Sequence, residues 1–345
     1  MSLKSSTFSY WIRCYSYNNE YILYLKRNIH PNYICNALLF ISLPYLLLRW
    51  VILYIYEISI GKRLIDKFVK SDRNKKFQHQ IAIVVISKNE GPYINEWIEY
   101  HKLVGVTKIY FYDNESKDNT VKILSPYIAS GIVEYTQIKG KSKQLDAYND
   151  AIVRYKDICR YMAFIDMDEY IVPTVSLKPI YEVVDELIQQ AGKGAAGIGI
   201  NWAIFGSSHL EKTPSGLIMD NFINRGKKNH WINFHIKTIC NPRLVANYVS
   251  PHYPLYKIGG YSISEATSKR LYGWFCWSVE YKNIRINHYF TKSKEQFIQK
   301  RNRGLADRIG IYDIEKFNMY DQNDIRDESM DVYSNLIKEN KISIQ

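Results

Sequence analysis

Two aspartates, Asp166 and Asp168, are separated by one residue and directly follow an apolar segment at 162–165. In an extended segment, side chains two residues apart point to the same side, so these carboxylates are expected to lie close together. Such carboxylates repel each other unless a cation or a shared proton lies between them. A hard divalent cation held by one or two carboxylates completes its coordination with water and substrate phosphates. The pair therefore predicts Mg²⁺ or Mn²⁺ carrying a diphosphate.

The elements that must position this pair alternate regularly. Strands are expected at 81–86, 108–112, 132–137 and 162–165, with amphipathic or capped helices between them. Strands that alternate with helices imply right-handed crossovers and an α/β fold with a mainly parallel sheet flanked by helices. In such sheets, ligands bind beyond the carboxyl ends of the strands.

Polar residues follow three of these strands. Ser87-Lys88-Asn89-Glu90 follows the first strand, Asp113 to Asp118 the second, and Asp166 to Glu169 the fourth. One polar strand end is usually only a turn, because Asn, Asp and Ser favour turns. Three of them on one edge of one sheet favour a binding site.

A glycine pattern at 192–197 has the spacing of a dinucleotide fingerprint. It follows a helix and precedes an apolar run, whereas the fingerprint requires a strand first and a helix second. No nicotinamide cofactor is therefore expected.

The segment from Ile83 to Pro173 resembles the GT-A glycosyltransferases, and most closely their family 2-like and family 92 branch. The resemblance is carried by Lys88-Asn89-Glu90, Glu96-Trp97-Ile98-x-Tyr100-His101, Asp113-Asn114-x-Ser116-x-Asp118, Gln144 and Asp166-Met167-Asp168-Glu169-Tyr170. Further matching motifs are Trp202-x-x-Phe205-Gly206-Ser207-Ser208, Lys237-x-Ile239, Asn287-His288-Tyr289 and Lys292-Ser293-x-Glu295-x-Phe297 through Arg303-Gly304. The similar region spans about 81–305.

The resemblance implies a metal-dependent transfer of sugar from a nucleotide-diphospho-sugar donor to a hydroxyl of a glycan or glycolipid acceptor. Asp113 would contact the nucleoside, and Lys88, Asn89 and Glu90 would line its pocket. Gln144 belongs to the same donor-binding set, and Asp166 and Asp168 would bind the metal ion and the diphosphate. His288 is implied as a late metal or phosphate contact.

Other roles stay open. Ser293 to Gln296 form a capping-box pattern, which predicts a helix start after His288. Lys300, Arg301 and Arg303 either neutralise the leaving diphosphate or satisfy the carboxyl end of that helix. The candidates for a general base are Glu211, Asp220 and Glu265. Ser208 and His209 depart from the family pattern, in which Gly often stands between Ser and His, so the shape of the acceptor-side loop is in question.

Two other functions compete with sugar transfer. Magnesium-dependent nucleotidyl or phosphoryl transfer also uses paired carboxylates, but the sequence contains no Gly-x-x-x-x-Gly-Lys-Ser/Thr phosphate loop. A non-enzymatic protein of a membrane surface is the second alternative. Nucleic-acid binding is not expected, because eight of the twelve net positive charges lie in residues 1–80 and the rest of the chain is nearly balanced.

Residues 1–80 form a basic and apolar segment with a run of twenty mostly apolar residues from Ala37 to Tyr56. Twenty such residues can span a bilayer, although Pro44 and Arg49 also allow a kinked or surface-lying helix. More basic residues follow the run than precede it, which predicts membrane association with the catalytic domain on the cytoplasmic side.

The glycosyltransferase-like domain is expected at 81–310 and a helical tail at 311–345. Five scattered cysteines argue against a disulfide framework.

Overall fold

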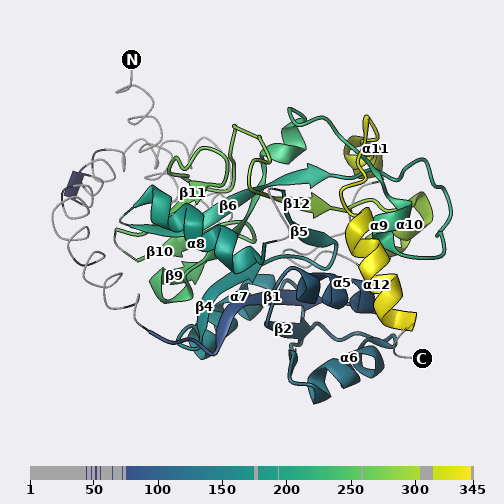
Figure 1. The fold of residues 1–345 in the computed structure, drawn as a ribbon, viewed down its shortest axis with the longest axis horizontal. Helices are drawn as coiled ribbons and strands as arrows, with labels where there is room; N and C mark the ends of the chain where they lie inside the picture. The colour runs from purple at the N-terminus through teal and green to yellow at the C-terminus, as the bar shows by residue number, and fades with distance from the viewer. Residues whose placement is uncertain are drawn as a thin grey trace.

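The computed structural model describes residues 75–174, 178–192, 194–257, 259–303 and 314–342, together with isolated positions before residue 75. A nine-stranded sheet forms the centre, with helices against both faces (Figure 1). Its order is β3-β2-β1-β4-β8-β6-β12-β5, and β11 pairs with β6. Most of the predicted membrane-associated run at 37–56 lies outside the described residues. No helix in the described part of the chain is both long and apolar enough to cross a bilayer.

The first half of the sheet is built as the sequence predicts. Its elements are β1 (His79–Ser87), α5 (Gly91–Leu103), β2 (Lys108–Asp113), α6 (Thr120–Ala129), β3 (Val133–Gln137), α7 (Gln144–Tyr155) and β4 (Cys159–Phe164). β1 is parallel to both β2 and β4, and β2 is parallel to β3. The carboxyl ends of these strands therefore meet at one edge.

The second half makes the sheet mixed. The elements that follow β4 are β5 (Glu169–Pro173), α8 (Ile180–Ala191), β6 (Ala195–Ile204), α9 (Ile218–Asn221), β7 (Asn224–Arg225), η2 (Trp231–Phe234), β8 (Ile236–Cys240), η3 (Pro242–Leu244), β9 (Val245–Tyr248), β10 (Pro254–Tyr256), β11 (Tyr261–Ser264), β12 (Ile284–His288) and α10 (Lys294–Arg303). Of these strands, β9 and β10 pair with each other and β7 pairs with β13, outside the central sheet. β8 lies antiparallel between β4 and β6. β12 is parallel to β6 and antiparallel to β5. The fold is thus α/β with a mixed, mostly parallel sheet.

The apolar run of β1 is buried on both faces. Ile81, Ile83 and Val85 belong to a core that includes Trp97 of α5. Ala82 and Val84 face the opposite way into a second cluster that includes Tyr148 of α7. Because successive side chains of a strand alternate between faces, a continuous apolar run is what a strand covered on both sides requires.

The glycine-rich segment after α8 confirms the predicted order of helix before strand. Gly192 caps α8 with a φ of 81°, and β6 begins at Ala195. A positive φ favours glycine, so this glycine serves a helix end rather than a phosphate-binding turn.

The C-terminal segment packs onto the same core through α11 (Glu315–Tyr320), β13 (Ile325–Arg326) and α12 (Asp331–Ile342). Tyr333 of α12 contacts Tyr100 of α5 with ring centroids 5.1 Å apart. Asp327 accepts hydrogen bonds from Arg225 and Arg285 at 2.5 and 2.9 Å. These contacts tie the segment to β7 and β12.

Candidate functional site

The ends of β1 and β2 form one polar cluster. Ser87 and Asp113 are register partners, which places the loops after the two strands side by side. The backbone N–H of Asn89 donates to the Ser116 hydroxyl at 2.9 Å, and the N–H of Ser116 donates to the Asp113 carboxylate at 3.1 Å. Asp113 also accepts from the Tyr135 hydroxyl at 2.8 Å and is 1% exposed. The structure therefore brings together Asn89 and Asp113, two residues of the predicted nucleoside pocket.

Lys88 and Glu90 flank Asn89 in the same loop. Asn89 has a φ of 53°, a conformation that Asn tolerates better than most residues. Glu90 occupies the N-cap position of α5, and its carboxylate lies 4.0 Å from the ammonium group of Lys292. The loop after β1 is thereby connected to the segment just before α10.

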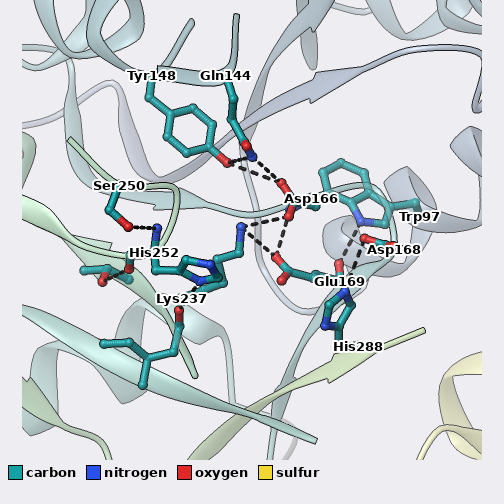
Figure 2. A network of polar contacts seen from close by, with 12 residues as sticks. Trp97, Gln144, Tyr148, Asp166, Asp168, Glu169, Lys237, Ser250, His252 and His288 are labelled. Carbon is teal, nitrogen blue, oxygen red and sulfur yellow. Dashed lines mark hydrogen bonds and ion pairs between the residues drawn. The ribbon is translucent and has the colours of Figure 1, made fainter. Parts of the chain in front are cut away.

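Asp166 lies within a network of buried polar groups (Figure 2). Its carboxylate accepts from Gln144 Nε2 at 2.7 Å, from the Tyr148 hydroxyl at 3.5 Å and from Lys237 Nζ at 2.9 Å. Gln144 is the first residue of α7, so the start of this helix holds the first aspartate of the pair. Glu169 accepts the backbone N–H of Asp166 at 2.8 Å, which fixes the turn between β4 and β5.

Lys237 projects from the middle strand β8 and is 1% exposed. Its ammonium group also lies 3.5 Å from Glu169. Burial alone lowers the pKa of an ammonium group, but Asp166 and Glu169 outweigh it and raise the pKa of Lys237 well above its usual value. Lys237 is therefore a fixed positive charge beneath the aspartate pair.

Asp168 faces a second set of partners. It is 5% exposed, forms an ion pair with Lys300, and lies 3.7 Å from His288 Nε2. Burial tends to raise the pKa of Asp168, but Lys300 and His288 hold it well below its usual value. His288 reaches this position because it ends β12 as the register partner of Glu169. Burial lowers the pKa of His288, which favours the neutral imidazole.

The predicted metal ligands therefore meet only in part. Asp168 and His288 are close, whereas Asp166 contacts Gln144 and Lys237 (Figure 2). Across the described ranges, no group of three or more His, Cys, Asp or Glu side chains could hold a metal ion. The two carboxylates and a neutral imidazole nevertheless suit a divalent cation that draws its remaining ligands from substrate phosphates.

The Glu96-Trp97-Ile98-x-Tyr100-His101 motif supports the site from behind. Trp97 Nε1 donates to the Glu169 carbonyl at 2.8 Å, and the Tyr100 hydroxyl donates to the Ile171 carbonyl at 2.9 Å. Glu96 accepts the backbone N–H groups of Ile218 and Met219 at 2.7 and 3.1 Å. Burial raises the pKa of Glu96 to about 7. The motif thus positions β5 and α9.

The capping box before α10 is confirmed. The Gln296 N–H donates to the Ser293 hydroxyl at 3.2 Å, and the Ser293 N–H donates to Gln296 Oε1 at 3.0 Å. Lys300, on the same helix, contacts Asp168 and donates to the Phe290 carbonyl at 3.2 Å. The ammonium group of Lys300 is therefore directed toward the aspartate pair.

The three candidate bases are all engaged by other groups. Glu265 accepts the backbone N–H of Asn283 at 3.0 Å, Asp220 pairs with Lys338 at 2.8 Å, and Glu211 pairs with Lys294 at 3.4 Å. These contacts give structural roles to Glu265 and Asp220 and a surface ion pair to Glu211.

The loop that departs from the family pattern has two consecutive left-handed residues. Ser208 and His209 have φ values of 50° and 64°, a conformation that costs non-glycine residues energy. The C-terminal segment compensates: Asn323 accepts the N–H of Ser208 at 2.8 Å, and Asp321 accepts that of Ser207 at 2.5 Å. A Cβ on Gly206 would lie 2.4 Å from Asn323, so only glycine allows this close approach.

Lys237 and Glu169, two members of the network around Asp166, were not predicted as site residues. The available signal was a single lysine in the otherwise uncharged strand Ile236–Cys240. A charged residue in a buried strand is rare unless it is paired, so its presence points to a buried acidic partner.

The sequence model of glycosyltransferase family 92 matches residues 88–303. A family 92 protein of Ricinus communis is 25% identical over 138 residues, covering 40% of this chain and 25% of that protein. One of Arabidopsis thaliana is 31% identical over 110 residues, covering 30% and 18%. The beta-1,4-galactosyltransferase galt-1 of Caenorhabditis elegans is 24% identical over 151 residues, covering 40% and 36%. The matches thus span well under half the length of these relatives.

Solved structures give weaker similarity. Staphylococcus aureus TarS in complex with UDP-GlcNAc aligns with a TM-score of 0.33 and 15% identity, covering 48% of this chain and 46% of that one. The glucosyl-3-phosphoglycerate synthase of Mycobacterium tuberculosis with Mn²⁺ and UDP aligns with a TM-score of 0.28 and 14% identity, covering 48% and 58%. At these TM-scores the alignments support no conclusion about ligands.

Proposed function

The chain belongs to glycosyltransferase family 92, and we propose that it moves a sugar from a nucleotide-diphospho-sugar donor to a hydroxyl of a glycan or glycolipid, with Mn²⁺ or Mg²⁺ on the diphosphate. The observation that supports this most strongly is the aspartate pair after β4, in which each carboxylate already contacts a lysine. The carboxylates suit a bound cation, and the lysines suit the negative phosphates of the same ligand.

The loop after β1 and the carboxyl end of β2 suit the nucleoside end of the donor. Asp113 is held rigidly by Tyr135 and Ser116, so its carboxylate can accept hydrogen bonds from a nucleoside without rearranging. Lys88, Asn89 and Glu90 border the same edge. The donor would then lie with its nucleoside at this loop and its diphosphate at Asp166.

The diphosphate end lies at the aspartates. Asp166, Asp168 and His288 would hold a divalent cation, which as a Lewis acid supplies positive charge for the leaving diphosphate. Gln144 and Lys237 keep Asp166 in place. Lys300, which pairs with Asp168, could donate to a phosphate oxygen of the diphosphate. An acceptor hydroxyl would attack the anomeric carbon and lose its proton to solvent, while the bond from that carbon to the diphosphate oxygen breaks.

Nucleotide release from a panel of nucleotide sugars tests this function. UDP-galactose comes first, because the Caenorhabditis elegans relative is named a galactosyltransferase. We expect release that needs Mn²⁺ or Mg²⁺, stops with EDTA and is lost in Asp168→Asn. Asp157→Asn is the matched control, because Asp157 is an exposed partner of Lys75. Activity undiminished by EDTA, or full activity in Asp168→Asn, would contradict the proposal.

We also propose that residues 37–56 associate with a membrane and that the catalytic domain faces the cytoplasm. The proposal rests on the apolar run and on the basic residues that follow it. The 345-residue chain should sediment with membranes, whereas a shorter chain beginning at Phe77 should not. Recovery of both chains in the same fraction would reject the anchor.

A further inference from the structure

Aromatic side chains lie exposed on the surface near the start of β8. Trp277 is 72% exposed, and its ring is stacked on that of Phe275 with centroids 5.7 Å apart and an interplanar angle of 20°. Several exposed aromatic rings gathered on one surface indicate a binding site more strongly than a single exposed ring does. Trp231 is also exposed and lies 6.0 Å from His235 between ring centroids.

The local backbone explains why these rings share one side. His235 and Phe275 form an isolated antiparallel bridge, flanked by the hydrogen bonds from Cys276 N to the Phe234 carbonyl and from Ile236 N to the Trp274 carbonyl. Directly opposite residues of this kind bring their side chains together, and the two rings are 4.5 Å apart. Trp277, two residues after Phe275, follows it on the same side. The ring of Trp274 also lies near Phe275, with centroids 6.1 Å apart.

A continuous series of ring contacts leads from this surface to the aspartate pair. His235 is stacked on Trp202 with centroids 5.0 Å apart, and Trp202 lies 4.3 Å from His288. His288 Nε2 in turn lies 3.7 Å from Asp168. The exposed rings are therefore connected to the proposed site of chemistry and are not an isolated patch.

Two buried polar atoms along this series have no partner within the described part of the chain. They are Trp202 Nε1 and His288 Nδ1. A buried donor or acceptor left without a hydrogen bond costs free energy, so such atoms favour a ligand that supplies the missing partner. A hydroxyl group of a ligand at the aspartate pair could supply such a partner, whereas an apolar ring face would pack on the exposed rings of Trp277 and Phe275.

We propose that Trp277, Phe275 and His235, the aromatic platform, bind a neutral sugar ring of the acceptor and direct it toward Asp168. The C–H groups on one face of a pyranose ring pack on the electron-rich face of an aromatic ring, while its hydroxyls stay free for hydrogen bonds. This inference rests on the proposed function, since it assigns the acceptor end of the same site. The platform carries no charge of its own beyond His235, so a neutral carbohydrate fits it better than an anionic one.

Binding of the full chain to an array of immobilised neutral oligosaccharides tests the platform, without any donor present. Trp277→Ala should weaken binding to the best oligosaccharide about tenfold, the usual effect of losing one aromatic contact. Val153→Ala is the control, because it removes an apolar side chain of α7 that is as exposed as Trp277, at 72%, and it should bind as the unaltered chain does. Equal binding by the Trp277→Ala protein, or no oligosaccharide binding by the unaltered chain, would overturn the proposal.

Two further measurements separate the possible failures. Nucleotide-sugar binding should be the same in Trp277→Ala and in the unaltered chain, so loss of donor binding would show that the substitution acts on the fold. If the unaltered chain binds no nucleotide sugar while oligosaccharide binding still depends on Trp277, the proposed function fails and the platform stands. Sedimentation with phosphatidylglycerol vesicles that falls in Trp277→Ala, with no oligosaccharide binding, would instead assign these rings to a membrane surface and overturn the platform.

Discussion

The ammonium group of Lys237 lies 2.9 Å from the carboxylate of Asp166 and 3.5 Å from that of Glu169, almost completely shielded from solvent. One cation thus serves two acidic groups, one of which borders the proposed donor site. Replacing Lys237 by Met should destabilise the protein by about 3–5 kcal/mol, because the carboxylates are left without a buried counter-charge. Urea unfolding measures the loss.

A compensating substitution separates stability from function at this position. Burial raises the pKa of Glu169 well above its usual value, so the protonated carboxyl of Glu169 resembles an amide. The double variant Lys237→Met with Glu169→Gln fixes that neutral form and leaves only Asp166 without a counter-charge, so it should recover part of the stability. It should still bind a nucleotide sugar poorly, because Asp166 has lost its positively charged partner. Donor binding equal to that of the unaltered chain would show that Lys237 only balances charge.

Lys300 should act on the departing diphosphate. Because its ammonium group contacts Asp168, we expect Lys300→Met to lower kcat about a hundredfold, the usual cost of one donor that stabilises developing negative charge. Lys294→Met, on the same helix but paired with Glu211 at the surface, is the control and should leave kcat unchanged. An effect confined to the donor KM would indicate binding rather than stabilisation of the transition state.

Glu96 should make the stability of the fold depend on pH. Its pKa is raised from 4.5 to about 7 by burial, so the folded protein binds a proton that the unfolded chain has released between these values. The free energy of unfolding should therefore fall as pH rises from about 4.5 to about 7. Urea titrations of the unaltered chain and of Glu96→Gln should differ in this window, and parallel curves would show that other groups dominate.

Asp327 should anchor the C-terminal segment. Arg225 and Arg285 hold the pKa of its carboxyl far below the usual range despite burial. Asp327→Ala leaves two arginines without their partner and should destabilise the protein by about 3 kcal/mol. Asp324→Ala, which removes only a 3.9 Å contact with Lys227, should change the melting temperature little. Similar melting temperatures for the two variants would contradict this role.

The first half of the sheet was predictable because its information is local. Continuous apolar runs, as in Ile81–Ile86, and turn residues at each strand end fix the order of elements without knowledge of distant contacts. The same logic predicted that the polar residues after β1, β2 and β4 would lie on one edge. It also identified the paired aspartates.

The partners of those aspartates were not predictable in the same way. Lys237 lies 71 residues after Asp166, and Lys300 lies 132 residues after Asp168. Their approach depends on the antiparallel placement of β8 and on the packing of α10, which residue spacing does not encode. The left-handed pair Ser208 and His209 is likewise tolerated only through contacts from residues 321–323.

The antiparallel strand β8 has a consequence for assembly of the enzyme. Since β8 enters between β4 and β6, the cation beneath Asp166 arrives only after a distant stretch of chain has been inserted into the middle of the sheet. A fragment ending before residue 236 would contain both aspartates and the loops after β1 and β2, yet would lack this cation. Catalytic competence should therefore emerge late in folding and in one step, and splitting the gene between β6 and β8 should yield two inert halves.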